Sequence, residues 1–461
     1  MRILYVVPNP PSLIRVRPYN LIRGLAARGH RVTVATVWGN EEERADVERL
    51  RGDGVAVIAA PVPKGQVLRN LLAAALAGLP LQALYARSPQ LERMLAGEIA
   101  GRQAAAEAYD IVHVEHLRAA RYGLHMKSVL ASGRSGTVPV VWDSVDCISY
   151  LFEQAAARSS SRAGRLGARL ELARTRRYEG RLVGQFDRVL VTSALDRDEL
   201  RRCRLSVAVE QAPLGRGQRI AGAARGGRPA AGDREGATED GRRRVDITVI
   251  PNGVDLDYFV PAGGPREPAT VLFSGKMSYH ANVTAALRLI EEIMPRVWAG
   301  RPDARLVIAG KDPAREILAC QRAIGSPRLS VTGTVPDIRP YLQRATLAVS
   351  PVVYGAGIQN KALEAMACAT PVVASARAVA ALAARDGEEV LVAGDDEAFA
   401  GQVLRLLGDP GAAARLGQAG RRYVETHHDW NRIVGDLEAI YEGCRCWPLA
   451  CSRPGQVTAG G

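Results

Sequence analysis

The segment from Ser350 to Ser375 constrains the fold of this chain more than any other. Its sequence, SPVVYGAGIQNKALEAMACATPVVAS, predicts the end of a strand, a glycine loop, a helix and a second buried strand. Gly355 and Gly357 allow the backbone to turn tightly and to approach a ligand. The first turn of the helix then offers unpaired N–H groups and the positive end of a dipole, which suit phosphate. An ordinary helix N-terminus in an α/β domain would show the same pattern.

Lys361 and Glu364 lie three residues apart in the predicted helix, so their side chains share one helix face. A cation at this place can bind phosphate, and a carboxylate can accept hydrogen bonds from sugar hydroxyls. The pair therefore predicts a nucleotide diphosphate as the ligand. The alternative is that both side chains are simply solvated.

The length of the chain predicts two or three domains, because 461 residues exceed what one hydrophobic core usually serves. A hydrophobic content of 47% with 24% charged residues is typical of a soluble globular protein. No apolar run reaches the roughly 18–20 residues that span a bilayer. The opening MRILYVV runs into Pro8 and is too short for a signal peptide, so we expect a cytoplasmic location.

The net charge of +13 indicates either an anionic partner or a general bias of composition toward Arg. Nucleic acid is disfavoured as that partner, because aromatic residues make up only 5% of the chain and the Arg-rich stretches lack interleaved aromatics. The Cys residues show no paired C-x-x-C spacing. We therefore expect neither a zinc site nor a disulfide framework, and no required metal or other cofactor.

Apolar runs alternate with helical stretches along most of the chain, which predicts two parallel, doubly wound sheets. The first array of predicted strands is 3–7, 31–37, 55–60, 111–114, 138–142 and 188–192. The second array is 247–250, 270–274, 304–309, 329–332, 346–349 and 371–374.

This division predicts a first α/β domain over 1–203 and a second over 246–424. Residues 204–245 between them are rich in Gly, Arg, Ala and acidic residues, which predicts a disordered insert. A final amphipathic helix is expected over 425–442 and a disordered tail over 443–461. Because ligands of open α/β sheets lie at the carboxyl ends of the strands, the two domains are expected to face one another across a ligand cleft.

Five short motifs follow one another in the second half of the chain: VIPNGVD at 249–255, FSGKM at 273–277, LVIAG at 306–310, VTGTVPD at 331–337, and residues 357–367 with TPVVA at 370–374. In this order and spacing they resemble the GT-B glycosyltransferases, within the large retaining family (group 1, family 4-like) that contains many bacterial polysaccharide enzymes. The resemblance covers residues 1–203 and 246–442. Residues 109–118 and 274–282 are similar to a subgroup associated with exopolysaccharide and protein-sorting gene clusters.

The resemblance implies a donor site in the second domain. Glu364 matches the second glutamate of the family's E-x7-E motif, which holds the ribose hydroxyls of the nucleotide. The first glutamate of that motif would fall at Ala356 and is absent. Because relatives use that glutamate to contact the donor sugar, recognition of the sugar is expected to differ here.

The same resemblance assigns the diphosphate to the loop of Gly275 and Lys276. Lys276 stands where family members often carry an Arg, while a Lys that is usual five residues later is replaced by Ala281. Lys361 is expected to supply the missing charge from the opposite loop, because a leaving pyrophosphate needs stabilisation as its bond breaks.

Polar residues at strand ends of the first domain are the candidates for acid–base or acceptor-side chemistry. Glu115 and His116 follow one predicted strand and Asp143 follows the next. His113 lies inside the strand pattern and is expected to be a packed core residue, and Asp146 is a candidate N-cap. The route commonly proposed for retaining members needs no protein nucleophile.

Arg15 and Arg17 follow the first strand, where relatives commonly carry a glycine-rich turn. They are expected to approach the donor phosphates when the domains close. A plain surface loop is the alternative.

Two segments are candidates for contact with a membrane. Residues 71–85 are apolar with Arg69 and Arg87 on either side, which indicates either an interfacial segment or a buried helix pair. The Arg-rich stretch 163–181 is amphipathic, which suits anionic lipid or simply a solvated face.

Taken together, these patterns predict a glycosyltransferase that moves a sugar from a nucleotide-diphosphate donor to a saccharide or lipid-linked acceptor. We expect retention of configuration, a role in cell-surface or exopolysaccharide synthesis, and a cytoplasmic location at the inner face of the membrane. The alternatives are another GT-B enzyme, such as a nucleotide-sugar epimerase or an inverting transferase, and a partner protein that binds ligand without chemistry.

Overall fold

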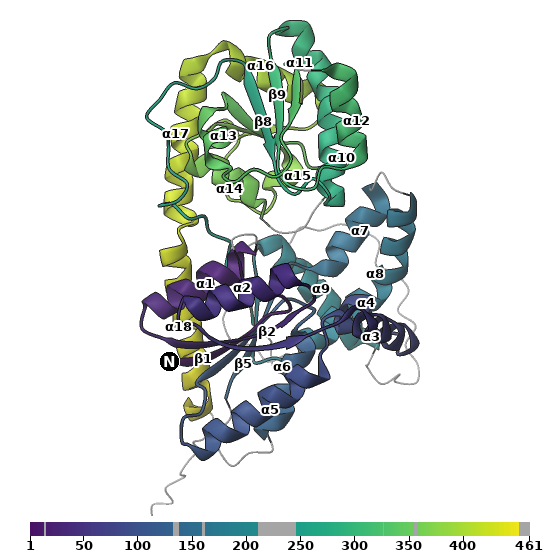
Figure 1. Cartoon of the computed structure of the whole chain (residues 1–461), viewed down its shortest axis with the longest axis vertical. Coiled ribbons are helices and arrows are strands. Elements are labelled where there is room, and N and C mark those ends of the chain that lie inside the picture. Colours follow the sequence, from purple (N-terminus) through teal and green to yellow (C-terminus); the bar gives the residue numbers. More distant parts are fainter. Residues whose placement is uncertain are drawn as a thin grey trace, which may run out of the picture.

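The computed structural model describes residues 1–12, 15–131, 138–158, 162–210, 246–325, 327–354 and 358–450. These residues form two α/β domains, one above the other along the long axis of the molecule (Figure 1). Each domain is built around one parallel sheet, which confirms the predicted fold class.

The first domain contains a seven-stranded sheet in the order β3-β2-β1-β4-β5-β6-β7. Its strands are β1 (Arg2–Val6), β2 (Arg31–Trp38), β3 (Ala56–Pro61), β4 (Ile111–Glu115), β5 (Val140–Val145), β6 (Arg188–Val191) and β7 (Ile247–Val249). Its helices are α1 (Val16–Ala27), α2 (Glu41–Gly52), α3 (Lys64–Leu76), α4 (Leu81–Tyr85), α5 (Pro89–Ala104), α6 (Ala120–Ala131), α7 (Ile148–Arg158), α8 (Arg162–Val183) and α9 (Ala194–Glu210). Two separate apolar clusters, one on each face of the sheet, account for the strands being apolar runs without alternation.

The second domain contains a six-stranded sheet in the order β10-β9-β8-β11-β12-β13. Its strands are β8 (Thr270–Ser274), β9 (Arg305–Ala309), β10 (Leu329–Val331), β11 (Leu347–Ser350), β12 (Val372–Ser375) and β13 (Leu391–Ala393). Its helices are α10 (His280–Arg288), a π-helical turn (Leu289–Ile293), α11 (Met294–Gly300), α12 (Arg315–Ile324), α13 (Arg339–Arg344), α14 (Asn360–Ala367), α15 (Ala376–Val379), α16 (Asp396–Gly408) and α17 (Pro410–His427). One large apolar cluster forms its core.

The strand order reverses direction between β1 and β4 in the first sheet and between β8 and β11 in the second. The loops after these strands therefore diverge, and this is where ligands of doubly wound sheets bind. In the second domain the two loops are the one that begins at Gly275 and the one that leads into α14. Both belong to the segments that the sequence predicts to bind the donor.

The predicted boundaries need three corrections. Residues 247–249, expected in the second domain, pair with β6 and form the edge of the first sheet. Residues 204–210, expected in the disordered insert, continue α9, and the rest of that insert lies outside the described residues. Residues 443–450, expected in a disordered tail, continue the last helix, α18 (Trp430–Ala450).

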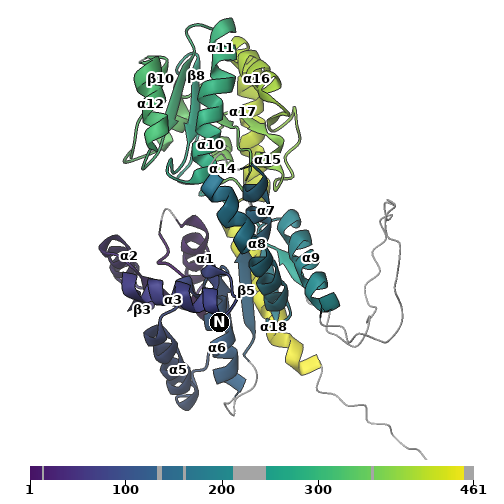
Figure 2. The same ribbon diagram turned by 90° about the vertical axis from the view of Figure 1, so that its right-hand side faces the viewer.

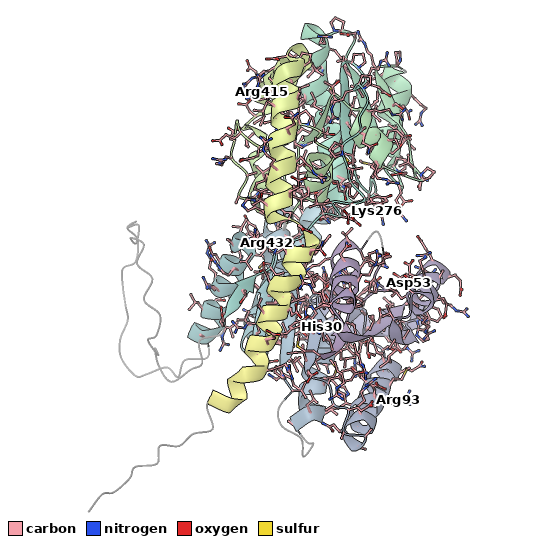
Figure 3. The ribbon with its side chains drawn as sticks, turned by 90° about the vertical axis from the view of Figure 1, so that its left-hand side faces the viewer. His30, Asp53, Arg93, Lys276, Arg415 and Arg432 are labelled. Atoms are coloured by element: carbon pink, nitrogen blue, oxygen red, sulfur yellow. The ribbon has the colours of Figure 1, made fainter. Side chains whose placement is uncertain are left out.

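Helix α18 returns to the first domain after the chain has completed the second. Figure 3 shows it running along the first domain beside His30, whose Nε2 lies 2.7 Å from Glu438 Oε1. Its apolar residues, including Val434 and Tyr441, pack with β1 and α1 in one cluster. The expected single helix over 425–442 is instead divided at His428 and Asp429 between α17 and α18.

The two domains also meet through the end of α7 and the start of α8, which are seen nearest the second domain in Figures 1 and 2. Ala155, Ala156 and Ala168 form a small buried cluster with Ala281 and Tyr354 of the second domain. Ala281 therefore lies in a packed contact rather than at an open site.

We predict that Gly310→Ala destabilises the second domain by about 2–4 kcal/mol. Gly310 has φ 146°, and a Cβ there would lie 1.8 Å from the carbonyl oxygen of Gly275, so the chain would have to move at both strand ends. Gly325→Ala is the matched control, because Gly325 also has a positive φ of 78° but an added Cβ meets no atom within 4 Å. Chemical denaturation followed by circular dichroism measures both, and equal losses would contradict the close approach of the two loops.

Candidate functional site

A buried ion pair lies at the centre of the first domain's polar residues. Arg17 donates from Nε and Nη2 to Asp143 Oδ2, at 2.9 and 2.7 Å. Its remaining Nη1 donates to the carbonyl oxygen of Pro251 at 3.1 Å and to Asn252 Oδ1 at 3.0 Å. Asp143 Oδ1 accepts from the N–H of Val145 at 3.0 Å. Both charged groups are thus buried with their hydrogen bonds satisfied, which is the condition for tolerating such a pair.

Two further buried groups surround this ion pair. Glu115 Oε2 accepts a hydrogen bond of 2.7 Å from the hydroxyl of Tyr5. His113 stacks on Tyr5 with ring centroids 4.2 Å apart, and its Nδ1 lies 2.7 Å from the hydroxyl of Tyr441 on α18. His113 Nε2 lies 3.8 Å from Asp143 Oδ2. The expectation that His113 is a packed residue agrees with this burial.

Burial and the charge of Asp143 control the protonation of these groups. Burial, and then the negative charge of Asp143, raise the pKa of Glu115 to about 8. Burial lowers the pKa of His113 to about 4. At neutral pH the cluster therefore contains one ion pair, a protonated Glu115 and a neutral His113.

Ligand atoms of His113, Glu115 and Asp143 lie within 4.8 Å of one another, close enough to share a cation. A cation bound there would lie next to the guanidinium of Arg17, which already occupies Asp143 Oδ2. The donor set therefore does not fit a metal ion, and the absence of a required metal stays a prediction.

His116 lies at the end of β4 in a left-handed backbone conformation, with φ 72°. Its N–H donates to the carbonyl oxygen of Asp143 at 2.6 Å, and its Nδ1 accepts from the N–H of Arg118 at 3.2 Å. Burial, and then the charge of Arg118, lower its pKa to about 3. A neutral, half-buried imidazole results, whereas Glu115, expected at the same strand end to face a cleft, is buried on Tyr5.

The second domain places a lysine between its two divergent loops. Lys361 Nζ donates to Asn282 Oδ1 at 2.5 Å and lies 4.9 Å from the ring centroid of Phe273. Asn282 Nδ2 in turn donates to the carbonyl oxygen of Lys276 at 2.9 Å. A Cβ at Gly275, where φ is 146°, would lie 2.9 Å from that same Asn282 amide. The absence of a side chain at Gly275 is therefore what allows Asn282 to orient Lys361.

Burial lowers the pKa of Lys361 to about 8, although the charge of Glu364 acts in the opposite direction. Burial also raises the pKa of Glu364 to about 7, and Lys361 opposes this shift. Lys361 makes no ion pair within 4.0 Å in the part of the chain that the structure describes. A partly buried cation without a close counter-charge is suited to an anionic ligand.

Lys276 lies at the end of the second domain nearest the first (Figure 3), with its amine exposed and 3.9 Å from Asp312 Oδ2. Its predicted role as a phosphate ligand stays a prediction. Gly355 and Gly357, together with Ala356, lie outside the described residues, and their predicted roles stay predictions.

A hydrogen bond links the polar cluster of the first domain to helix α14 of the second. Asn252 Nδ2 donates to Asn360 Oδ1, the first residue of α14, at 3.2 Å. Because Asn252 also accepts from Arg17, a continuous chain of contacts runs from Asp143 to the residue before Lys361. The two sets of predicted site residues therefore belong to one region of the molecule.

A cavity of about 280 Å³ lies at the carboxyl ends of β1, β2 and β3 in the first domain. Asn9, Trp38, Lys64, Val67 and Tyr85 are among the residues that line it. Such a cavity, with aromatic and polar walls, is a candidate for a saccharide or another polar acceptor.

Arg15 and Arg17 are both engaged within the first domain. Arg15 Nη2 lies 2.6 Å from Glu43 Oε1, and Glu43 lines the cavity. Arg17 is buried on Asp143. Contact of either guanidinium with a donor phosphate stays a prediction, and it requires the present ion pair to open.

Several residues of this region were not found from the sequence. Tyr5 and Tyr441 appeared only as apolar residues in a strand and a helix, because nothing local shows that a hydroxyl will meet a distant His or Glu. Asn252 lies in the Pro-Asn-Gly turn that the sequence does mark. Asn282 and Asn360 had no recognisable signal of their own.

The chain is similar in sequence to known glycosyltransferases. Residues 14–217 match the family described as glycosyl transferase 4-like domain, and residues 268–409 match the family described as glycosyl transferases group 1. The chain is 29% identical over 395 residues to D-inositol 3-phosphate glycosyltransferase of Salinispora arenicola, covering 82% of this chain and 78% of that protein.

Other relatives match over shorter stretches. Phosphatidyl-myo-inositol mannosyltransferase of Mycobacterium leprae is 29% identical over 205 residues, covering 43% of this chain and 54% of that protein. The lipopolysaccharide core biosynthesis mannosyltransferase LpcC of Rhizobium leguminosarum is 30% identical over 227 residues, covering 46% of this chain and 63% of that protein.

Solved structures share the whole architecture at low identity. Sucrose-phosphate synthase of Thermosynechococcus elongatus superposes with a TM-score of 0.64 at 18% identity, covering 98% of this chain and 100% of that one. Anabaena HepE in complex with UDP superposes with a TM-score of 0.61 at 13% identity, covering 96% and 100%. These likenesses establish the fold.

We predict that Glu115→Gln flattens the dependence of stability on pH between about 5 and 8. In the wild type the folded protein holds the Glu115 proton up to a pKa of about 8, whereas the unfolded chain releases it near 4.5. Stability therefore falls as pH rises through this window, by up to about 1.4 kcal/mol per pH unit. Denaturation curves at successive pH values measure the slope.

Glu48→Gln on the exposed face of α2 is the control for that experiment. It should leave the slope of the wild type unchanged. A wild-type slope that persists in Glu115→Gln would show that Glu115 is ionised in the folded protein, contrary to the prediction.

Proposed function

We propose a donor and an acceptor class for this chain, which is a glycosyltransferase of the GT-B fold with a glycosyl transferase 4-like domain followed by a glycosyl transferase group 1 domain. The donor is a nucleoside-diphosphate sugar bound by the second domain. The acceptor is a saccharide or a lipid-linked saccharide bound by the first.

The arrangement of Lys361 supports the donor proposal more than any other observation. Its amine is partly buried between the two divergent loops, is oriented by Asn282, and lacks a close anionic partner among the described residues. A diphosphate at the N-terminus of α14 would provide that partner, and the unpaired N–H groups of the helix would bind the same anion. Among the structural neighbours, HepE has been crystallised with UDP and with UDP-glucose.

Glu364 lies one helical turn beyond Lys361 on the same face of α14. We assign it to the ribose hydroxyls, which would donate to its carboxylate. Lys276 at the end of β8 would approach the phosphates from the other side. Ala281 is packed against α7 and α8, so a lysine there would disrupt the contact between domains, and Lys361 supplies that charge in its place.

We assign the acceptor to the cavity at the ends of β1, β2 and β3. The relatives named above act, by their names, on inositol phosphate, phosphatidyl-inositol and lipopolysaccharide core. A polar acceptor of the cell surface is consistent with these names. We place the reaction in the cytoplasm, at the inner face of the membrane.

Retention of configuration is the proposed outcome. Asp143 is bound by Arg17, and Glu115 is protonated at neutral pH, so neither of these carboxyl groups is a ready nucleophile or base. A route in which the acceptor attacks on the face of the leaving diphosphate requires neither. His116, neutral at the end of β4, carries its proton on Nε2 because Nδ1 accepts from the Arg118 N–H, so it would donate a hydrogen bond to an oxygen of the acceptor.

We predict that Lys361→Met weakens binding of the productive nucleoside diphosphate by about 10–100-fold, since a charge-assisted bond contributes roughly 1.5–3 kcal/mol. A panel of nucleoside diphosphates and their sugar conjugates, screened by thermal shift, first identifies the ligand, and calorimetry then measures the two affinities. Lys127→Met is the matched control, because Lys127 lies on α6 and pairs with Asp187. Failure of every panel member to stabilise the wild type would contradict the donor site.

Glu364→Gln tests whether Glu364 binds the ribose hydroxyls of the nucleotide. It should weaken binding of ribonucleoside diphosphates by about tenfold and affect the 2′-deoxy forms less, because one acceptor for the hydroxyls is weakened. Equal losses for both forms would exclude the ribose role.

The packing of Ala281 and the presence of Ala356 favour one second candidate, a partner protein that binds nucleotide without transferring sugar. The same panel of nucleoside diphosphates and their sugar conjugates distinguishes the transferase from such a partner protein. Stabilisation by nucleotide with no transfer or hydrolysis from any donor would support the second candidate.

A further inference from the structure

Helix α3 carries a row of leucines that face solvent. Leu68, Leu72 and Leu76 follow one another at intervals of four residues and are 69%, 60% and 81% exposed. Residues four apart lie on one face of a helix, so the three side chains form a continuous apolar stripe. The opposite side of the helix packs into the domain through Asn70 and Ala74. Of the two alternatives for residues 71–85, a fully buried helix pair is therefore wrong for α3.

Helix α8 adds to this surface. Leu166 and Leu170 are 61% and 65% exposed, while Ala168 between them is buried against the second domain. The N–H of Leu81, at the start of α4, donates to Glu171 Oε2 at 2.7 Å and so joins α8 to the α3–α4 pair. Figure 2 shows α3 and α8 next to one another on the side turned to the viewer. We call the exposed leucines of α3 and α8 the leucine face.

The charges around the leucine face are positive. Residues 64–85 contain no Asp or Glu, and Lys64 and Arg69 are exposed on α3, as is Arg169 on α8. The two glutamates of α8 are occupied. Glu171 binds the Leu81 N–H and lies 3.6 Å from Arg174, and Glu179 is buried on the first N–H groups of α7. Exposed apolar stripes bordered by basic residues are typical of helices that lie on anionic bilayers.

A second copy of the chain fits this surface less well. Symmetric pairing of two leucine faces would bring the arginines of both copies together, and like charges at an interface are unfavourable. At an anionic lipid surface the leucines would enter the apolar layer, and the arginines would lie beside anionic headgroups.

The same helix leads to the acceptor cavity. Lys64 and Val67, in the first turns of α3, line the cavity, and Tyr85 at the end of α4 lines it as well. The leucine stripe starts at Leu68, the next residue along the helix. A headgroup that projects from a bilayer under the leucine face would lie near these cavity residues.

We propose that the leucine face binds the surface of an anionic lipid bilayer, with α3 lying in the plane of the interface. None of the described helices has the length and apolarity needed to cross a bilayer, so the contact is with its surface. The presentation of a lipid-linked acceptor to the cavity rests on the function proposed above, whereas binding to the bilayer does not.

Sedimentation of the full chain with vesicles tests the proposal. The wild type should bind vesicles that contain phosphatidylglycerol and phosphatidylcholine, and bind phosphatidylcholine alone much more weakly. Replacing Leu68, Leu72 and Leu76 together by Ser should lower the partition coefficient at least about tenfold, because three side chains no longer enter the bilayer. Leu76→Ser alone, at the most exposed of the three positions, should lower it in the same direction.

Leu205→Ser is the matched control, since Leu205 lies on α9 and is 65% exposed. It should bind vesicles as the wild type does. Replacing Arg69 and Arg169 by Gln should remove most of the preference for anionic lipid and its sensitivity to salt. Unchanged thermal unfolding midpoints would show that all variants fold.

Three results would overturn the proposal: a wild type that stays in solution with anionic vesicles, a triple variant that binds as well as the wild type, or self-association through the same leucines in analytical ultracentrifugation. The proposed transferase function is assayed separately, with a nucleoside-diphosphate sugar and a lipid-free acceptor. The triple variant should keep that activity, so failure of the donor site and failure of the membrane face are distinguishable.

Discussion

The ion pair between Arg17 and Asp143 is the interaction on which the rest of the first domain's site depends. It joins the start of α1 to the end of β5, and through Pro251 and Asn252 it holds the segment where the chain first leaves the domain. Burying both charges is costly, and it is tolerated here because each is fully hydrogen-bonded. Removing one partner would leave the other charge buried and alone, at a cost of about 3–5 kcal/mol.

The same pair contributes to the protonation of its neighbours. Burial and then the charge of Asp143 raise the pKa of Glu115 to about 8, and they outweigh the charge of Arg17, which acts to lower that pKa. Tyr441 then links this cluster to α18, which returns from the second domain. The chain passes between the domains at Asn252 and again near His428, where the carbonyl of His428 accepts from Val254 at 2.8 Å and Trp430 packs against Gly253. The polar cluster and the two crossings are therefore one connected structure.

The fold could be predicted from the sequence because buried parallel strands are apolar runs of a length that local patterns reveal. The exceptions have a physical reason. β7 is only three residues long and stands directly before a motif of the second domain, so local pattern gave no sign that it pairs with β6. Asp146 was a candidate N-cap of α7, but the first N–H groups of α7 are bound by Glu179 from α8. Contacts between residues far apart in sequence determined both outcomes.

The same distinction between local patterns and contacts distant in sequence applies to the candidate site. That Lys361 and Glu364 share one helix face could be predicted, because their spacing on a helix is a local property. The roles of Arg17 and Glu115 could not, since their partners Asp143 and Tyr5 are distant in sequence.

The difference between the two halves of the site indicates where a charged ligand binds. In the first domain the buried charges of Arg17 and Asp143 compensate one another, and Glu115 and His113 are neutral, so a diphosphate would gain little there. In the second domain Lys361 is held by a neutral amide and an aromatic ring, and burial already draws its pKa down to about 8. An anion beside Lys361 would raise its pKa back toward the usual value and offset the cost of burying its charge. The electrostatics thus favour an anionic donor on the second domain and a largely neutral acceptor on the first.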